Sequence, residues 1–156
     1  GVEQNIYLYA LKKTNVGQYS PVNSIKIDRF EVGVKALNEQ GFNPENDVVV
    51  EHDLPAEGLV KALHVDLAVE GDQYKLKAQS SGVSLLVLPV EYSACFKFKK
   101  AKSSGELEPR ILPVDLAFVG ILFEKDIDTV LAYRNGPFTN SGCRFADYSD
   151  FKQKIT

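Results

Sequence analysis

The residue types that could carry catalysis or bind a metal are two histidines and several closely spaced carboxylates. His52 and His64 fall in different predicted elements, and neither has the spacing of a metal-ligand motif. A glycosidase needs two facing carboxylates about 5–10 Å apart, whereas acids at a strand start, such as Asp126 and Asp128, are usually solvated turn residues. Oxygen ligands in the loops near Asp126 or Asp147 would suit calcium better than catalysis. We expect no catalytic residue, no metal ligand and no cofactor.

Aromatic side chains give the more specific hint, because their faces stack on sugars as readily as they fill cores. They crowd the most apolar part of the chain, and a buried position is the default for phenylalanine. Tyrosine and arginine are the residue types that we expect at a binding surface. The candidates for carbohydrate binding are Tyr92, Tyr133, Arg110 and Arg134.

Length and charge limit the class of protein. The chain has 156 residues, enough for one domain with a proper core, and we treat residues 1–156 as a single domain. Its net charge of −3 argues against a nucleic-acid partner. The apolar run from Val83 to Val90 is too short to span a bilayer. Because the chain contains no methionine, we expect it to be a fragment of a longer protein.

Cysteine usage leaves two alternatives open. The spacing of Cys95 and Cys143 matches no zinc motif. The two residues either pair in a disulfide, if the compartment is oxidising, or remain two buried thiols.

The apolar centre of the chain predicts two long strands at residues 84–98 and 109–123, with a polar loop at residues 99–108 between them. Residues 59–70 and 74–79 alternate between apolar and polar positions across Gly71, which predicts a hairpin with one wet face. A turn is expected at Ser80–Gly82. Further strands are expected at residues 5–11, 22–27, 47–51 and 126–134.

One helix is predicted near residues 29–40. Asp28 precedes it as a capping residue, and Gly41 follows it as a left-handed terminator. Its apolar stripe is expected to consist of Phe30, Val34 and Leu37.

These elements predict a mainly β fold. Many short strands with frequent turn signals are typical of an antiparallel β-sandwich, here of the jelly-roll or carbohydrate-binding-module type, with the helix as a cap. Residues 139–156 form a polar C-terminal tail with a short helix from Asp147.

Four segments resemble the C-terminal extracytoplasmic domain of bacterial YfhO-like membrane proteins of the GT-C glycosyltransferase type. Gly41 to Glu51 is similar to a loop and strand of that family, and Leu85 to Phe98 is similar to its next strand and turn, with Phe96 where tryptophan is usual. Asp115 to Ile121 and Asp128 to Tyr133 follow its last two motifs, with Asp115 in place of asparagine. The resemblance adds Phe96 and Asp115 to the carbohydrate-binding candidates.

The resemblance implies a non-catalytic extracytoplasmic accessory domain of a multi-spanning membrane glycosyltransferase-like protein. Such a domain would be anchored through its parent chain, contact the membrane helices of that chain, and position a cell-envelope glycan or a lipid-linked acceptor. This location also agrees with a disulfide between Cys95 and Cys143. The alternative is a stand-alone carbohydrate-binding module of a secreted or surface protein, which predicts an exposed aromatic platform. A small hydrolase is a third interpretation and requires a deep pocket with an acid–base pair.

Overall fold

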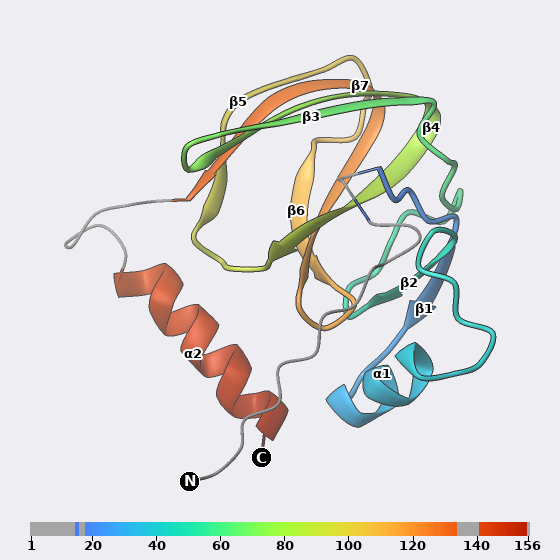
Figure 1. Ribbon diagram of the computed structural model, residues 1–156, viewed down its shortest axis with the longest axis vertical. Coiled ribbons are helices and arrows are strands. Elements are labelled where there is room, and N and C mark those ends of the chain that lie inside the picture. Colours follow the sequence, from blue (N-terminus) through green and yellow to red (C-terminus); the bar gives the residue numbers. More distant parts are fainter. Residues whose placement is uncertain (1–14, 16–17, 134–140, 156) are drawn as a thin grey trace, which may run out of the picture.

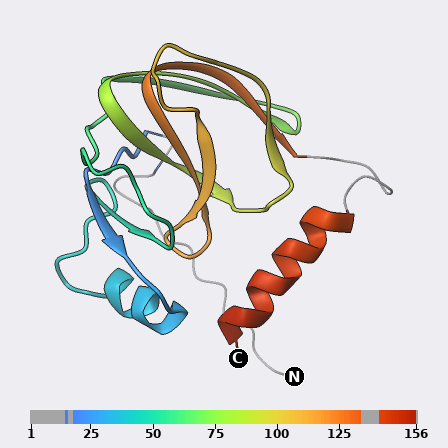
Figure 2. The ribbon, with the colours of Figure 1, turned by 180° about the vertical axis from the view of Figure 1, so that it is seen from behind.

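The structure is a computed structural model that describes residues 15, 18–133 and 141–155. Within these residues, seven strands form one sheet with the order β1-β2-β6-β7-β4-β3, and β5 pairs with β7 beside this path. The strands are β1 (Asn23–Lys26), β2 (Asp47–Val50), β3 (His64–Glu70), β4 (Gln73–Glu91), β5 (Phe96–Ser103), β6 (Arg110–Val114) and β7 (Phe118–Tyr133). The helices are α1 (Phe30–Leu37) and α2 (Ser141–Ile155), which lie at opposite sides of the β structure (Figures 1 and 2).

The mainly β class is confirmed. The sheet is mixed rather than purely antiparallel, because β1 pairs with β2 in the parallel direction. The jelly-roll or carbohydrate-binding-module form of a sandwich stays a prediction. The expected strand at residues 5–11 lies outside the described residues.

Two long strands organise the sheet. The first part of β7 pairs with β6 and with residues 83–91 of β4, and its second part pairs with β5 and with residues 73–79 of β4. Between these parts, residues 80–82 of β4 lie opposite Lys125 alone, which has a φ of 60°. Such a bulge bends both strands, so β3, β5 and the ends of β4 and β7 arch over β6 (Figure 1).

The bulge corrects the expected turn at Ser80–Gly82, because β4 continues through it. The hydroxyl of Ser80 contacts that of Ser84, and the Ser84 hydroxyl donates to the carbonyl of Val60. These hydrogen bonds give the hydroxyl groups of Ser80 and Ser84 partners within a continuous strand. The small polar residues therefore mark a bend and not a chain reversal.

The main core lies between the two parts of the bent strands. Leu86 and Phe123 from one part pack with Leu76, Ile127 and Leu131 from the other, and all five side chains are nearly or fully buried. A second cluster covers the other face of β6 and of residues 83–91. Apolar residues line both faces there, which explains why this stretch of sequence is apolar without alternation.

Helix α1 is shorter than the predicted helix, and its predicted apolar stripe is only partly confirmed, because Leu37 packs against the cluster of Ile27, Ala36 and Val49 while Val34 does not. Arg29 is its N-cap without a side-chain cap bond, so Asp28 does not cap it, and Asn38 ends it in place of a left-handed Gly41. The buried residues are Gly33 and Ala36, whereas Val34 is 38% exposed. A Cβ atom at Gly33 would lie 2.6 Å from side-chain atoms of both Ile27 and Leu116, so close packing selects the glycine face.

Other boundaries also differ from the prediction. Turns divide the expected strand at residues 84–98 between β4 and β5, and the expected strand at residues 109–123 between β6 and β7. Strand β5 continues to Ser103 through residues expected in a loop, because its backbone pairs with β7 while its lysines point to water. Helix α2 begins at Ser141 and not at Asp147.

Candidate functional site

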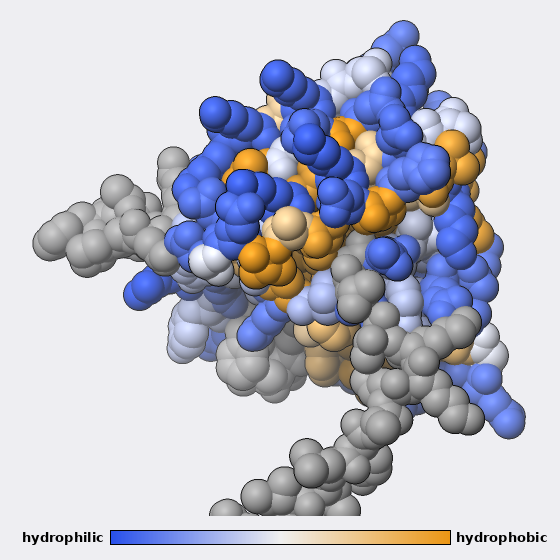
Figure 3. Space-filling view, turned by 45° about the horizontal axis from the view of Figure 1, so that its top comes forward, coloured by the Kyte–Doolittle hydropathy of each residue, from blue (hydrophilic) through white to orange (hydrophobic). Residues whose placement is uncertain are grey.

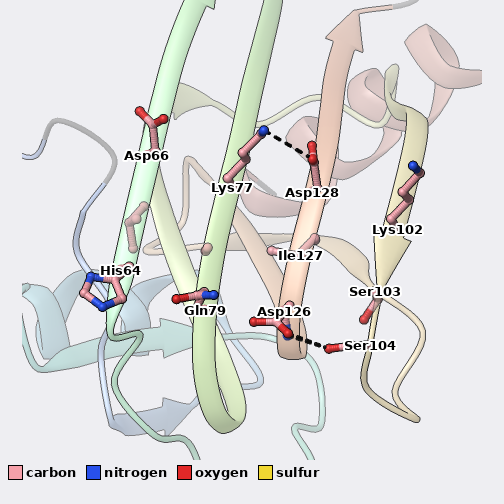
Figure 4. A pocket seen from close by; sticks show the side chains of 12 residues that line it. His64, Asp66, Lys77, Gln79, Lys102, Ser103, Ser104, Asp126, Ile127 and Asp128 are labelled. Atoms are coloured by element: carbon pink, nitrogen blue, oxygen red, sulfur yellow. Dashed lines mark hydrogen bonds and ion pairs between the residues drawn. The ribbon is translucent and has the colours of Figure 1, made fainter.

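A hollow of about 590 Å³ lies on the outer face of β3, β4, β7 and β5 (Figure 4). We call it the polar groove, after the polar side chains that line it: His64, Asp66, Lys77, Gln79, Lys102, Ser103, Ser104, Asp126 and Asp128. Figure 3 shows the molecule with the top of Figure 1, where β3, β5 and β7 lie, turned forward. Hydrophilic residues project from this surface, and hydrophobic residues lie between them.

Strand pairing places these side chains in two rows across the sheet. In one row, Asp66 is opposite Lys77, Lys77 is opposite Asp128, and Asp128 is opposite Lys102. Negative and positive groups therefore alternate along the row, and Lys77 Nζ lies 3.5 Å from Asp128 Oδ2. The second row contains His64, Gln79 and Asp126.

The alternating sequence of the strands creates this surface. Leu76, Ala78 and Ile127 point into the core, so Lys77, Gln79 and Asp128 must point outward. The same alternation that buries the core builds the groove.

A fixed loop closes one end of the groove. The Ser104 hydroxyl donates to Asp126 Oδ2 over 3.0 Å, and the backbone of Asp126 donates to the Ser104 hydroxyl over 3.1 Å. The Glu124 carboxylate accepts from the backbone N–H groups of Leu107 and Glu106, and these bonds lower the pKa of Glu124. The loop after β5 is thus held by hydrogen bonds at both of its sides.

The groove is suited to binding a polar, uncharged ligand. Its three carboxylates accept hydrogen bonds, its two ammonium groups donate them, and Gln79 does both. A sugar hydroxyl also donates and accepts. The opposite charges nearly cancel, which disfavours a polyanion.

The carboxylates and His64 in the groove are exposed to water. Within the described residues, no three or more His, Cys, Asp or Glu side chains come together in a way that could hold a metal ion. The groove thus offers hydrogen-bonding groups on an open surface.

Two of the residues predicted from sequence, Tyr92 and Arg110, lie together elsewhere. They line a smaller hollow of about 240 Å³ with His52, Asp53 and part of β6, which we call the Tyr92 hollow. Tyr92 is half-buried, and its N–H donates to the carbonyl of Ala117. Asp53 forms an ion pair with Lys26, which lowers the pKa of Asp53.

Phe96 and Tyr133 form no exposed platform. Their ring centroids are 5.5 Å apart in an edge-to-face arrangement, and Phe96 also contacts Tyr74 at 6.2 Å. Phe96 packs against the main core. Phe96 therefore helps to fill the end of that core, and Tyr133 packs against Phe96. Arg134 lies outside the described residues.

Asp115 is a structural residue at the corner between β6 and β7. Asp115 and Leu116 have φ angles of 49° and 67°, and the Ala117 N–H donates to the Val114 carbonyl, which makes a tight turn. The Val49 N–H donates to Asp115 Oδ1 over 2.8 Å, and the Asp115 N–H donates back to the Val49 carbonyl over 2.8 Å. Burial raises the pKa of Asp115 to about 6.

Cys95 and Cys143 form a disulfide that joins the turn between β4 and β5 to α2. Asp147 reinforces the junction, because its carboxylate accepts from the Ser93 hydroxyl over 2.6 Å and from the Ala94 N–H over 2.7 Å. The sequence left this pairing open.

Sequence reasoning missed the groove as a unit. The sequence singles out His64, Asp126 and Asp128 for possible chemistry, but it indicates Lys77 and Gln79 only as part of a wet strand face. The alternating pattern of residues 74–79 held the signal, but the strand register that joins it to β7 was missing.

Comparison of the chain with protein-family models, with curated proteins and with solved structures finds no match. Neither α1 nor α2, the helices of the described residues, is long and apolar enough to cross a membrane.

Proposed function

We propose that this chain is a non-catalytic accessory domain that holds a neutral glycan or a lipid-linked sugar in the polar groove. In this proposal the domain works outside the cytoplasm, as part of a membrane-anchored, glycosyltransferase-like protein. The observation that carries the proposal is the row of alternating charges across four strands, because it offers paired donors and acceptors on a fixed surface.

Two further observations support it. The disulfide between Cys95 and Cys143 is suited to an oxidising compartment, since thiols stay reduced in most cytosols. The acids of the groove are exposed to water and belong to a shallow surface, whereas general acid–base catalysis usually relies on carboxylates in a secluded site. The groove therefore favours binding over hydrolysis.

The test is a glycan-binding screen of the 156-residue chain, followed by titration with each glycan that binds. Lys77→Ala should weaken binding roughly tenfold or more, because a charge-assisted hydrogen bond worth about 1.5–3 kcal/mol is lost. Lys75→Ala is the matched control. Lys75 lies on the same strand and face and also forms an ion pair, with Glu70, but it does not line the groove. Equal affinities of the two variants, or no glycan binding at all, would refute the proposal.

The Tyr92 hollow supports a second candidate function, the stand-alone carbohydrate-binding module. There an aromatic ring lines a hollow together with Asp53 and Arg110, a combination that suits sugar stacking. Under this alternative, Tyr92→Ala abolishes glycan binding and Lys77→Ala leaves it unchanged. The same titration therefore separates the two surfaces.

A further inference from the structure

Helix α2 presents a fixed outer face. Its inner side carries Cys143, joined to Cys95, and Asp147, which accepts hydrogen bonds from Ser93 and Ala94 in the turn between β4 and β5. Because these two residues are one turn apart, the helix is held at two points on one side. The opposite side must point away from the sheet.

That opposite side combines aromatic and basic residues. Phe145 is 71% exposed and Tyr148 is 62% exposed, and the two lie three residues apart on one face. Arg144 and Lys152 are also exposed, and each lies four residues from Tyr148. We call these four residues the aromatic–basic face. It carries only positive charge, although the whole chain has a net charge of −3.

We propose that the aromatic–basic face of α2 binds the surface of a lipid bilayer that contains anionic headgroups. Phenylalanine inserts among the upper acyl chains, tyrosine sits at the headgroup level, and flanking arginine and lysine attract acidic lipids. This segregation of basic and aromatic groups on one face, with the acid Asp147 turned inward, is complementary to such a surface.

The size of the face favours a membrane over a protein partner. An aromatic side chain buries about 150–250 Å², so two of them bury no more than about 500 Å². A stable protein interface typically buries about 800 Å² on each partner. A small aromatic face with basic neighbours is sufficient for reversible attachment to a bilayer, where the basic residues add an attraction that salt weakens.

This inference is independent of the groove. None of the four residues lines the polar groove, so Lys77→Ala should leave lipid binding unchanged. A failure of glycan binding would leave the lipid result standing, and the reverse also holds.

The test is co-sedimentation of the 156-residue chain with vesicles of phosphatidylcholine alone and with vesicles that also contain phosphatidylglycerol. We expect binding to the mixed vesicles at low salt, and a loss of at least fivefold when salt rises from about 50 mM to about 500 mM. The double variant Phe145→Ser, Tyr148→Ser should bind at least tenfold more weakly. Its control is Leu63→Ser, Val69→Ser, which changes two residues of comparable exposure, 66% and 62%, at β3.

A second pair of variants tests the position of the basic charge. The double variant Arg144→Gln, Lys152→Gln removes two positive charges from α2. The double variant Lys97→Gln, Lys99→Gln removes two from β5, and all four residues are exposed. Only the α2 pair should weaken binding. Because the substituted side chains are exposed, circular dichroism and an intact disulfide should show that each variant is folded.

Three outcomes would overturn the inference. The wild-type chain could fail to bind either vesicle, the β5 pair could weaken binding as much as the α2 pair, or the aromatic variants could bind like their control. Concentration-dependent dimerisation that Phe145→Ser, Tyr148→Ser abolishes, without lipid binding, would assign the face to a second copy of the chain instead.

Discussion

Replacing Asp115 with asparagine should stabilise the protein at neutral and alkaline pH. The carboxyl is partly buried, and its pKa is raised from 3.8 to about 6 by that burial, against the smaller opposing effect of the hydrogen bond from Val49. Asparagine keeps the oxygen that accepts this bond, and it tolerates the left-handed conformation with φ of 49°. The substitution therefore removes the charge and preserves the corner.

The magnitude follows from the raised pKa. Below about pH 3 the carboxyl is mostly protonated in the folded and unfolded states, so it carries almost no charge penalty. Between about pH 4 and pH 6 the folded state binds more protons, and stability falls as pH rises. Above about pH 7 the penalty is complete and equals about 3 kcal/mol. Asp115→Asn should recover up to about this amount at pH 8 and almost nothing at pH 3.5.

Urea unfolding of the wild-type and variant chains at pH 3.5 and pH 8 measures the difference. Asp47→Asn serves as a control of opposite sign, because hydrogen bonds from Asn23 and Asn43 lower the pKa of Asp47. That variant should lose stability at pH 8 relative to the wild type and lose less at low pH. If Asp115→Asn gains no stability at pH 8, or gains equally at both pH values, desolvation of the carboxylate is not the cause.

Two further substitutions test the core and the disulfide. Leu86→Ala should lower the free energy of unfolding, measured in urea, by about 2–5 kcal/mol, because Leu86 is fully buried between the two parts of the bent strands. A loss below about 1 kcal/mol, close to that of the exposed control Leu63→Ala, would contradict the central placement of Leu86. Cys143→Ser should cost about 4 kcal/mol, because the disulfide closes a loop with a sequence separation of 48. Reductant should lower the stability of the wild type to that of Cys143→Ser and leave the variant unchanged, and an insensitive wild type would argue against the bond.

The sequence predicted those parts of the fold where local pattern and tertiary structure agree. Strand β2 is buried as its β-branched run indicated, and the hairpin between β3 and β4 turns at Gly71, which has the left-handed φ of 60° that such turns favour. Both features depend on neighbours a few residues away. Local chemistry was therefore sufficient to find them.

The errors arise where distant contacts override local preference. Ser80–Gly82 has turn composition, yet β4 remains paired with β7 on both sides of it. The helix was expected to bury Val34, but Gly33 allows the closest approach to Ile27 and Leu116, and this approach decides the buried face. Neither fact can be read from a segment alone.

The same distinction between local pattern and distant contacts applies to the residues predicted for the site. Tyr92 and Arg110 do meet, in the Tyr92 hollow, whereas Phe96 contacts the rings of Tyr74 and Tyr133. A sequence pattern can identify a residue as aromatic or charged. It cannot identify which distant strand will cover that residue.

The bend in β4 and β7 determines where the polar groove ends. Gln79 and Asp126 form the last pair before the bulge, and their outer face is open to water. Beyond the bulge, residues 84–88 are all buried, because the main core covers one face and the second cluster covers the other. The same two strands thus have one face exposed to water before the bulge and both faces buried after it. A ligand in the groove would meet Gln79 and Asp126 at the last paired position before both strands continue into the core.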